Sequence, residues 1–388
     1  MGLFGKKGGH LGIDIGADGI KLVEIKKVKG RPCLWTYGML SKHLDIHPPA
    51  AGILSQDQGS PSQLYPSPYT QIQQKEQKTI TQQAASAKKD PRIKEYGKLL
   101  KTIMKQAKVT SRRATASLPV SQVFHAIITL PQVEKKDLPH HVHAKVKKML
   151  PRPIEHMQVV HQLLPQESKK TNSEFLRVLV TAAPKNLVSF YSSIFQEAGV
   201  ELEELETEAF AIERSLIGHD ESTILVIDLG SQRTNFFVMD NSIPITHRSI
   251  HIGGEVLDEH IKDILAVDSQ KAEQIKIDLS RTSGQNQIDK NIFLPLINPI
   301  VKEIHSSIDV FDRQLGQHNK KIQKIILTGG TCLFPPILDT IQEKLNLSVF
   351  VGDPWARVVY QQGLKSVLDA IGPRMAVSIG LAMRTIVK

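Results

Sequence analysis

The sequence predicts an α/β protein of two similar halves, each opening on the same short motif. Ile13-Asp-Ile-Gly16 recurs as Ile227-Asp-Leu-Gly230, and strand-like alternation of apolar residues follows each glycine. Strand-like runs and helical stripes alternate between and after the two motifs. With 388 residues, 40% of them hydrophobic and 23% charged, the chain is long enough for two ordinary domains. We therefore expect a duplicated, two-lobed α/β fold.

The composition argues against a membrane-spanning protein, a disulfide-bonded secreted protein and a nucleic-acid-binding protein. No window holds the roughly 18 consecutive apolar residues that a membrane span requires, and the first residues are too few and too polar for a signal peptide. Two distant cysteines, Cys33 and Cys332, indicate a reducing cytoplasm rather than a disulfide framework or metal cluster. The net charge is +10, but the basic residues are spread out and not interleaved with aromatics. This argues against nucleic acid and leaves a solvated basic surface, an anionic membrane or an acidic partner.

The first half begins with residues 11–25, which form two strands joined by a turn at Gly16 and Gly19. A third strand is expected over 31–40, and the Gln/Ser/Pro-rich residues 43–89 are expected to be a disordered insertion. The remaining expected elements are a helix over 90–107, strands over 114–119 and 123–130, a basic helix over 134–150, a hairpin of 159–164 and 175–182, and helices over 184–198 and 205–216. His140, His141 and His143 are interpreted as surface residues, since no cysteine or carboxylate set accompanies them.

The second half repeats the hairpin at residues 225–239. It continues with a strand over 243–251, helices over 255–265, 269–277 and 292–315, strands over 322–327 and 349–352, and a final helix over 374–386. The strand ending at Leu327 leads into Gly329-Gly330, a double glycine before a helix, which is a frequent cradle for nucleotides.

The repeated hairpin has a plain and a functional interpretation. An Asp-x-Gly turn is often only a turn. A glycine turn also exposes backbone N–H groups to an oxyanion, while Asp14 holds a cation through water and Lys21 neutralises a phosphate. The recurrence at Asp228 favours the functional interpretation, because two facing turns would present two aspartates to one phosphate chain.

These motifs together resemble the actin-like ATPase superfamily, which includes actin, MreB and FtsA. The residues that carry the resemblance are Asp14-x-Gly16 with Lys21, Asp228-x-Gly230, Ala272-Glu-Gln-Ile-Lys276 and Thr328-Gly-Gly330. Other segments resemble the PilM family of type IV pilus assembly proteins more closely. They are Ser117-Leu-Pro-Val-Ser-Gln-Val-Phe, Met149-Leu-Pro151, Val180-Thr-Ala-Ala-Pro184 and Pro354-Trp-Ala-Arg-Val with the apolar residues 376–384.

The resemblance implies an actin-like bilobed ATPase fold with a 1C subdomain as in FtsA and PilM. The first lobe (1A) would comprise residues 1–121 and 180–222, and subdomain 1C residues 122–179. The second lobe (2A/2B) would span 223–374, and a helix over 375–388 would return to the first lobe.

Residue roles also follow from the resemblance, with ATP and Mg²⁺ as cofactors. Asp14 and Asp228 would hold Mg²⁺ through water. Gly16, Ala17 and Lys21 would bind the β- and γ-phosphates, opposite a second loop of Gly230, Ser231 and Thr234. Glu273 would bind the ribose, Lys276 would lie by the adenine, and Gly254, Gly329, Gly330 and Thr331 would complete the nucleotide site. Glu206, with Glu208 as the alternative, would orient the water in what is at most a slow ATPase reaction. Two solvated carboxylates at a helix N-terminus are an equally good interpretation.

The function implied is that of an ATP-binding cytoplasmic protein, peripheral at the inner membrane, that assembles type IV pili. Its partner would be the N-terminal cytoplasmic peptide of a PilN-like membrane protein, alongside other pilus assembly proteins, with a homodimer or polymer possible. An FtsA-like division filament is the alternative. FtsA carries an amphipathic helix after its core, and the lack of such a tail after the core helix here argues against this alternative. A small-molecule kinase is a third hypothesis, for which no catalytic aspartate is apparent.

Overall fold

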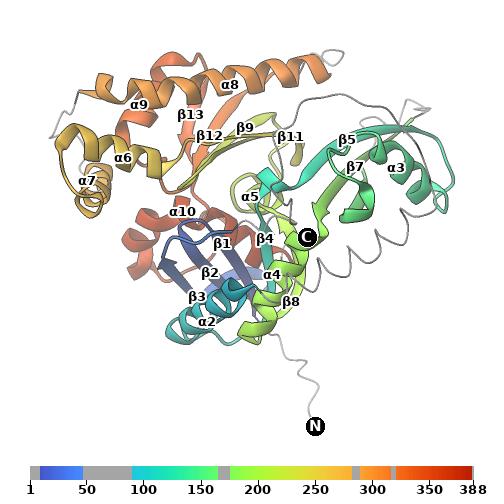
Figure 1. The fold of residues 1–388 in the computed structure, drawn as a ribbon, viewed down its shortest axis with the longest axis horizontal. Coiled ribbons are helices and arrows are strands. Elements are labelled where there is room, and N and C mark those ends of the chain that lie inside the picture. The colour runs from blue at the N-terminus through green and yellow to red at the C-terminus, as the bar shows by residue number, and fades with distance from the viewer. Residues whose placement is uncertain (1–8, 47–89, 165–174, 282–288, 316–319, 387–388) are drawn as a thin grey trace, which may run out of the picture. The chain divides into compact units, whose positions relative to one another are not determined.

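The computed structural model describes residues 9–46, 90–164, 175–281, 289–315 and 320–386, which form an α/β protein with three sheets (Figure 1). The chain divides into two compact units. Unit 1 comprises Met1–Leu44, Ile103–Ser121 and Glu203–Lys388, and unit 2 comprises Asp45–Thr102 and Gln122–Leu202. Most of the expected insertion, residues 47–89, lies outside the described residues, as does the polar hairpin loop.

The first five-stranded sheet is built around β1. Its strands are β1 (His10–Gly16), β2 (Gly19–Val28), β3 (Arg31–Ser41), β4 (Arg113–Leu118) and β8 (Glu201–Thr207), in the order β3-β2-β1-β4-β8. β1 pairs antiparallel with β2 and parallel with β4. The register places Asp14 opposite Lys21, so both side chains lie on one face of the sheet.

The second sheet has the same plan around β9. Its strands are β9 (Ile224–Leu229), β10 (Thr234–Asp240), β11 (Ile243–Ile250), β12 (Lys324–Thr328) and β13 (Ser348–Val351), in the order β11-β10-β9-β12-β13. β9 pairs antiparallel with β10 and parallel with β12. Because β1 and β9 occupy equivalent positions, the duplication predicted from the repeated motif is confirmed.

In unit 1, helix α10 (Lys365–Met383) contacts strands of both five-stranded sheets. The other helices of this unit are α5 (Glu208–Ile212), which continues as a π-helical turn (Glu213–Ile217), α6 (Gly254–Leu265), α7 (Ser269–Arg281), α8 (Leu294–Leu315) and α9 (Pro335–Lys344). α10 packs against β1 so closely that a Cβ at Gly12 would lie 1.9 Å from the Ser378 carbonyl oxygen. On its other side, a Cβ at Gly380 would lie 1.8 Å from the carbonyl oxygen of Ala211 in α5. Small residues therefore permit this central position.

Unit 2 contains a three-stranded antiparallel sheet, β5 (Phe124–Pro131), β6 (Met157–Leu163) and β7 (Phe175–Pro184), in the order β5-β7-β6. α3 (Leu138–Lys147) covers one face through Leu138, Val142 and Val146. α4 (Lys185–Ala198) ends at Gly199, whose φ of 72° provides the left-handed cap that the sequence predicts. α2 (Pro91–Gln106) begins in this unit and ends in unit 1. Short 3₁₀ turns occur at Val120–Gln122, Ile154–His156, Lys290–Phe293 and Gln362–Leu364.

Three element predictions are wrong in instructive ways. Residues 205–216 begin as the end of β8, because pairing at the sheet edge overrides helical propensity, and only then turn into α5. The basic helix is shorter than 134–150, since Pro139 in its first turn fixes its start. The final helix starts before residue 374, and Pro373 lies inside it.

One described helical segment, Gln362–Met383, is long and apolar enough to cross a membrane by composition. It is not an uninterrupted apolar run, because Lys365, Asp369 and Arg374 lie within it. Moreover, 67% of the segment's most apolar window is buried inside the protein, as in a core helix.

Candidate nucleotide site

Asp14 and Asp228 are brought together at the ends of the two central strands. Asp14 is 8% exposed and accepts a 2.7 Å hydrogen bond from the Ser117 hydroxyl of β4. Asp228 is held by the Asn235 amide, at 3.5 Å. Burial, followed by the charge of Asp14, raises the pKa of Asp228 to about 6. The charge of Asp14 therefore acts on Asp228, and a divalent cation bound by both carboxylates would offset their repulsion.

Glu208 is a third carboxyl group beside this pair. It is the first residue of α5 and accepts a 3.1 Å hydrogen bond from the Val120 backbone N–H. Burial, then the charges of Asp228 and Asp14, raise the pKa of Glu208 to about 8, so the ligand-free protein holds it protonated at neutral pH. Lys21 lowers the pKa of both Glu208 and Asp228 and thus belongs to the same cluster.

Glu206 does not belong to this cluster. Its carboxylate pairs with Arg214 and lies 3.7 Å from Arg384. The boundary between β8 and α5 falls at Thr207, so Glu206 belongs to the strand and Glu208 to the helix. We therefore replace Glu206 by Glu208 as the candidate that faces the acidic pair.

The predicted first phosphate loop is the β1–β2 turn. Gly19 has a φ of 120°, and a Cβ at Gly16 would meet no atom within 4 Å, so this turn faces open space. The carbonyl of Ala17 accepts the Leu44 N–H at 2.8 Å, which fixes the turn from behind. Asp18 is ion-paired with Arg374 of α10, at 2.5 Å.

The predicted second phosphate loop is the β9–β10 turn, and several of its polar groups already make hydrogen bonds within the protein. The Gly230 N–H donates to the Arg233 carbonyl, and the Gly230 carbonyl accepts the Gly254 N–H, both at 2.9 Å. The Ser231 hydroxyl donates to Glu255 at 2.8 Å. The Thr234 side chain is fully buried and donates to the Ile252 carbonyl at 2.7 Å. Thr234 therefore supports the loop.

The Gly329–Gly330 loop approaches both the turn and the acidic pair. Gly329 has a φ of 89°, and a Cβ there would lie 2.6 Å from Asp228 Oδ1 and 2.4 Å from the Leu229 carbonyl oxygen. The Thr331 N–H donates to that same carbonyl at 3.1 Å. A Cβ at Gly330 would only touch the Arg374 side chain. Glycine is thus required at 329 for both conformation and space.

The change Gly329→Ala should lower the free energy of unfolding by roughly 2 kcal/mol or more, because it adds steric overlap to an unfavourable φ. Urea unfolding of both proteins measures this difference. Gly363→Ala is the matched control, since a Cβ there meets no atom within 4 Å. Equal stability of the two variants would contradict the role of Gly329.

Gly254 lies close to the side chains of Lys276 and Thr331. A Cβ at Gly254 would lie 3.3 Å from Lys276 Nζ and 2.8 Å from Thr331 Oγ1. Lys276 Nζ is 2.5 Å from Asp258 Oδ2, whereas Asp258 Oδ1 is buried and has no hydrogen-bond partner. The charge of Glu273 also acts on Asp258, whose pKa is raised chiefly by burial. Sequence reasoning missed Asp258. Its signal is its place one helical turn after Gly254 on the same helix.

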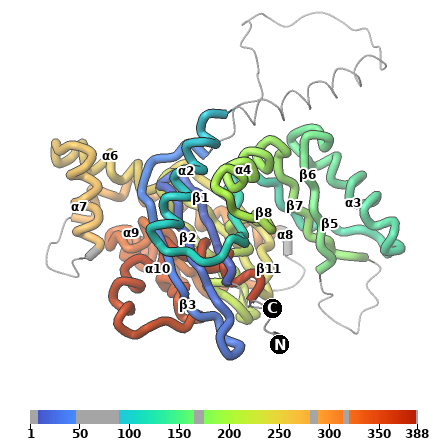
Figure 2. Tube along the Cα trace, turned by 90° about the horizontal axis from the view of Figure 1, so that it is seen from below, coloured from blue at the N-terminus to red at the C-terminus, as the bar shows by residue number. Residues whose placement is uncertain are grey.

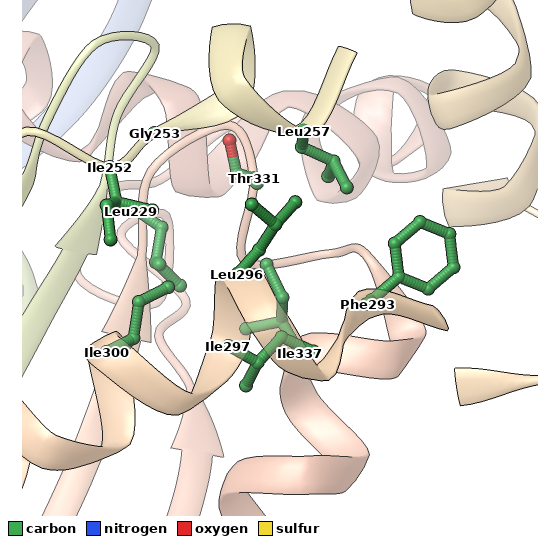
Figure 3. A pocket seen from close by; sticks show the side chains of 10 residues that line it. All are labelled: Leu229, Ile252, Gly253, Leu257, Phe293, Leu296, Ile297, Ile300, Thr331 and Ile337. Carbon is green, nitrogen blue, oxygen red and sulfur yellow. The ribbon is translucent and has the colours of Figure 1, made fainter. Parts of the chain in front are cut away.

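A small apolar cavity of about 20 Å³ lies beside Thr331 (Figure 3). Leu229, Leu257 and Thr331 line it beside residues of α8 and α9. Figure 3 shows these side chains converging from several elements. With room for about one water molecule, it is a packing defect and not a ligand pocket.

Among the described residues, no three His, Cys, Asp or Glu side chains are arranged to hold a metal ion directly. The site nevertheless fits Mg²⁺, because this ion keeps several waters and needs only one or two carboxylates when phosphates supply other ligands. Asp14 and Asp228, with a raised pKa at the latter, provide that donor set.

Comparison with known proteins places the chain in a family. The family model for type IV pilus assembly protein PilM matches residues 68–386. The solved structure of a PilM-PilN type IV pilus biogenesis complex is similar with a TM-score of 0.73 and 21% identity, covering 97% of this chain and 98% of that one. The chain therefore has the fold seen in that structure, and its two equivalent sheets agree with the two-lobed fold that the motifs predict.

A curated relative, the cell division protein FtsA of Enterococcus faecalis (strain ATCC 700802 / V583), is 25% identical over 203 residues. That match spans 45% of this chain and 44% of the relative, less than half of either protein. The family match spans most of the chain and is the broader of the two sequence similarities. The chain belongs to the family of type IV pilus assembly proteins PilM.

Proposed function

We propose that this chain binds ATP with Mg²⁺ at the Asp14–Asp228 pair as part of a type IV pilus assembly machine. The observation that carries the nucleotide proposal is the meeting of these two carboxylates with Lys21 and Glu208 beside glycine turns. Mg²⁺ would supply charge neutralisation for the phosphates. Lys21 would add a fixed cation, and the open backbone at Gly16 would admit a phosphate oxygen.

Glu208 would serve as the group that positions or deprotonates the attacking water. Its protonated state in the ligand-free protein suits this role, because a bound cation would stabilise the ionised form and switch the base on. Isothermal calorimetry of ATP with and without Mg²⁺ tests the cofactor proposal. Heat of binding that does not depend on Mg²⁺ would refute the role of the aspartates.

Asp258 is proposed to accept a hydrogen bond from a ribose hydroxyl, with Lys276 and Glu273 beside the base and sugar. Its buried Oδ1 has no partner, and such an atom is costly unless a donor reaches it.

We expect Asp258→Asn to weaken ATP binding about tenfold, because the amide accepts a sugar hydroxyl less strongly than a carboxylate and releases Lys276. Calorimetry measures the change. Asp263→Asn, a substitution further along α6, is the matched control. Unchanged affinity in Asp258→Asn would remove Asp258 from the site.

The proposed partner is the N-terminal cytoplasmic peptide of a PilN-like membrane protein. Family membership and the similarity to a solved PilM-PilN complex support it. Through this partner the chain would sit at the cytoplasmic face of the inner membrane.

A synthetic PilN N-terminal peptide should bind the purified chain with a dissociation constant of roughly micromolar or lower, corresponding to about 8 kcal/mol. Calorimetry with a sequence-scrambled peptide as control tests this. Absence of heat with both peptides would rule out the partner, whatever the result with ATP.

A division-filament function remains as a second proposal, favoured only by the partial similarity to FtsA. Filaments formed with ATP on lipid and seen by electron microscopy would support it. Their absence, together with peptide binding, would leave the pilus function.

A further inference from the structure

The end of the β2–β3 hairpin carries features that the nucleotide site does not use. The turn residues Lys29 and Gly30 have φ values of 48° and 83°, as tight two-residue hairpin turns require. Val28, just before the turn, is 50% exposed. In Figure 2 the blue hairpin ends in this turn at the lower edge of the view. A short, regular turn presents its side chains in a fixed arrangement.

Trp35 is turned outward by a β-bulge. The pairing shifts between Glu24, opposite Thr36, and Ile25, opposite Leu34, which leaves Trp35 as the extra residue. Its side chain is 56% exposed, the second highest value among the large exposed hydrophobic residues described. Lys26 Nζ lies 3.3 Å from the centre of the indole ring, so a cation already rests on the aromatic face. The indole is thus both positioned and accessible.

The surroundings of Trp35 are basic. Residues 25–44 include five lysines and arginines and no aspartate or glutamate: Lys26, Lys27, Lys29, Arg31 and Lys42. The segment after α2 reaches the same sheet, since the Thr36 hydroxyl donates to the Ala107 carbonyl at 2.6 Å. The last turn of α2 and the segment after it add Lys105, Lys108 and Arg112. The neighbouring Glu24 is fully buried, accepts the Thr110 N–H at 2.8 Å and lies 3.8 Å from Lys26 Nζ, so it offsets part of the charge of Lys26. Lys29 and Arg31 are exposed and supply the basic charge at the surface.

We propose that the hairpin end, defined as Lys26, Val28, Lys29, Arg31 and Trp35, binds the anionic surface of a lipid bilayer directly. Indole side chains favour the headgroup level, where the ring is apolar on one side and hydrated on the other. Clustered lysines and arginines are attracted to acidic headgroups.

A lipid surface fits the hairpin end better than an acidic protein does. One exposed tryptophan on β3 and one valine beside the turn are too little to form the apolar core of a stable protein interface. They suffice for shallow insertion between headgroups. The contact goes beyond the proposed function, because it needs neither nucleotide nor a membrane-protein partner.

Vesicle flotation of the purified full chain tests the proposal. The chain should float with vesicles containing one quarter phosphatidylglycerol in phosphatidylcholine, and about tenfold less with pure phosphatidylcholine. Lys29→Glu with Arg31→Glu should lower partitioning at least about 25-fold, since each basic residue near an anionic surface contributes about fivefold. Trp35→Ala should lower it severalfold. Raising the salt concentration should weaken all electrostatic binding.

Matched controls distinguish the effect of the hairpin end from the effects of net charge and of losing any exposed aromatic side chain. Lys302→Glu with Arg313→Glu on α8 makes the same change in net charge, from +10 to +6, because each of two residues changes by −2. Phe350→Ala removes another aromatic side chain that is 54% exposed. Both controls should float like the unmodified chain.

Intrinsic fluorescence gives a second readout. The chain has two tryptophans, and Trp355 is 1% exposed, with its indole N–H bonded to the Leu368 carbonyl. A blue shift on adding anionic vesicles therefore reports Trp35 entering a less polar environment.

No flotation with anionic vesicles, or flotation unaffected by the hairpin variants, would overturn the proposal. Binding of polyglutamate through the same residues without vesicle binding would overturn it in favour of an acidic protein. ATP and PilN-type peptide binding, measured on the same variants, should be unchanged. If the unmodified chain binds neither ATP nor the peptide, the proposed function is refuted, whereas the proposed lipid contact is not.

Discussion

Replacing Asp14 or Asp228 by alanine should weaken Mg²⁺–ATP binding at least about 100-fold, or by roughly 3 kcal/mol or more. Either change removes one of the two carboxylates that meet at the ends of β1 and β9. A single carboxylate would hold the hydrated ion too weakly to organise the phosphates. Calorimetry with saturating Mg²⁺ measures the affinity, and the thermal shift induced by ATP should disappear in both variants.

The same experiment has an informative control. Asp312→Ala, at an exposed position on α8, should bind Mg²⁺–ATP like the unmodified chain. In the absence of nucleotide, Asp228→Ala should not destabilise the fold through lost charge, because burial and Asp14 already oppose ionisation of Asp228. Retained ATP affinity in both aspartate variants would place the nucleotide elsewhere.

Glu208→Gln should stabilise the ligand-free protein and should abolish the ATP hydrolysis that we propose for this site. The pKa of Glu208 is raised from 4.5 to about 8, so ionisation is harder in the folded than in the unfolded chain. The contribution of this group is fully present below pH 4.5 and is lost as the pH rises toward 8. Glutamine can keep the hydrogen bond from Val120 without that cost. At pH 8 we expect a gain on the order of 3 kcal/mol and a higher melting temperature.

Glu206→Gln should act in the opposite direction. Glu206 is paired with Arg214, whose own pKa burial lowers to about 9, and the change leaves a buried cation without its partner. Melting curves between pH 5 and 8 distinguish the two variants, and ATP turnover should fall only in Glu208→Gln. Equal effects of the two substitutions would contradict the assignment of Glu208.

The backbone-centred parts of the site were predictable from the sequence. Asp14, Gly16 and Asp228 stand at strand ends in a repeated pattern, and strand register alone brings Lys21 beside Asp14. Gly329 was recognisable because a double glycine after a buried strand marks close backbone approach.

The parts that depend on tertiary context were not predictable. The choice between Glu206 and Glu208 depends on where β8 becomes α5, and pairing with the sheet decides that boundary. Thr234 has the right chemistry for a phosphate loop, but its rotamer is set by the Ile252 carbonyl across the hairpin. Asp258 becomes conspicuous only when its unpartnered oxygen is seen in three dimensions.

Two consecutive residues of α10 hold one loop from each half of the duplicated fold. The carbonyl of Pro373 accepts the Gly329 N–H at 3.0 Å, and Arg374 is ion-paired with Asp18 in the β1–β2 turn. The β1–β2 turn and the Gly329–Gly330 loop are therefore both attached to a single turn of α10. A displacement of either loop must strain or rotate this turn, so the loops share their motion even though more than 300 residues separate them along the chain.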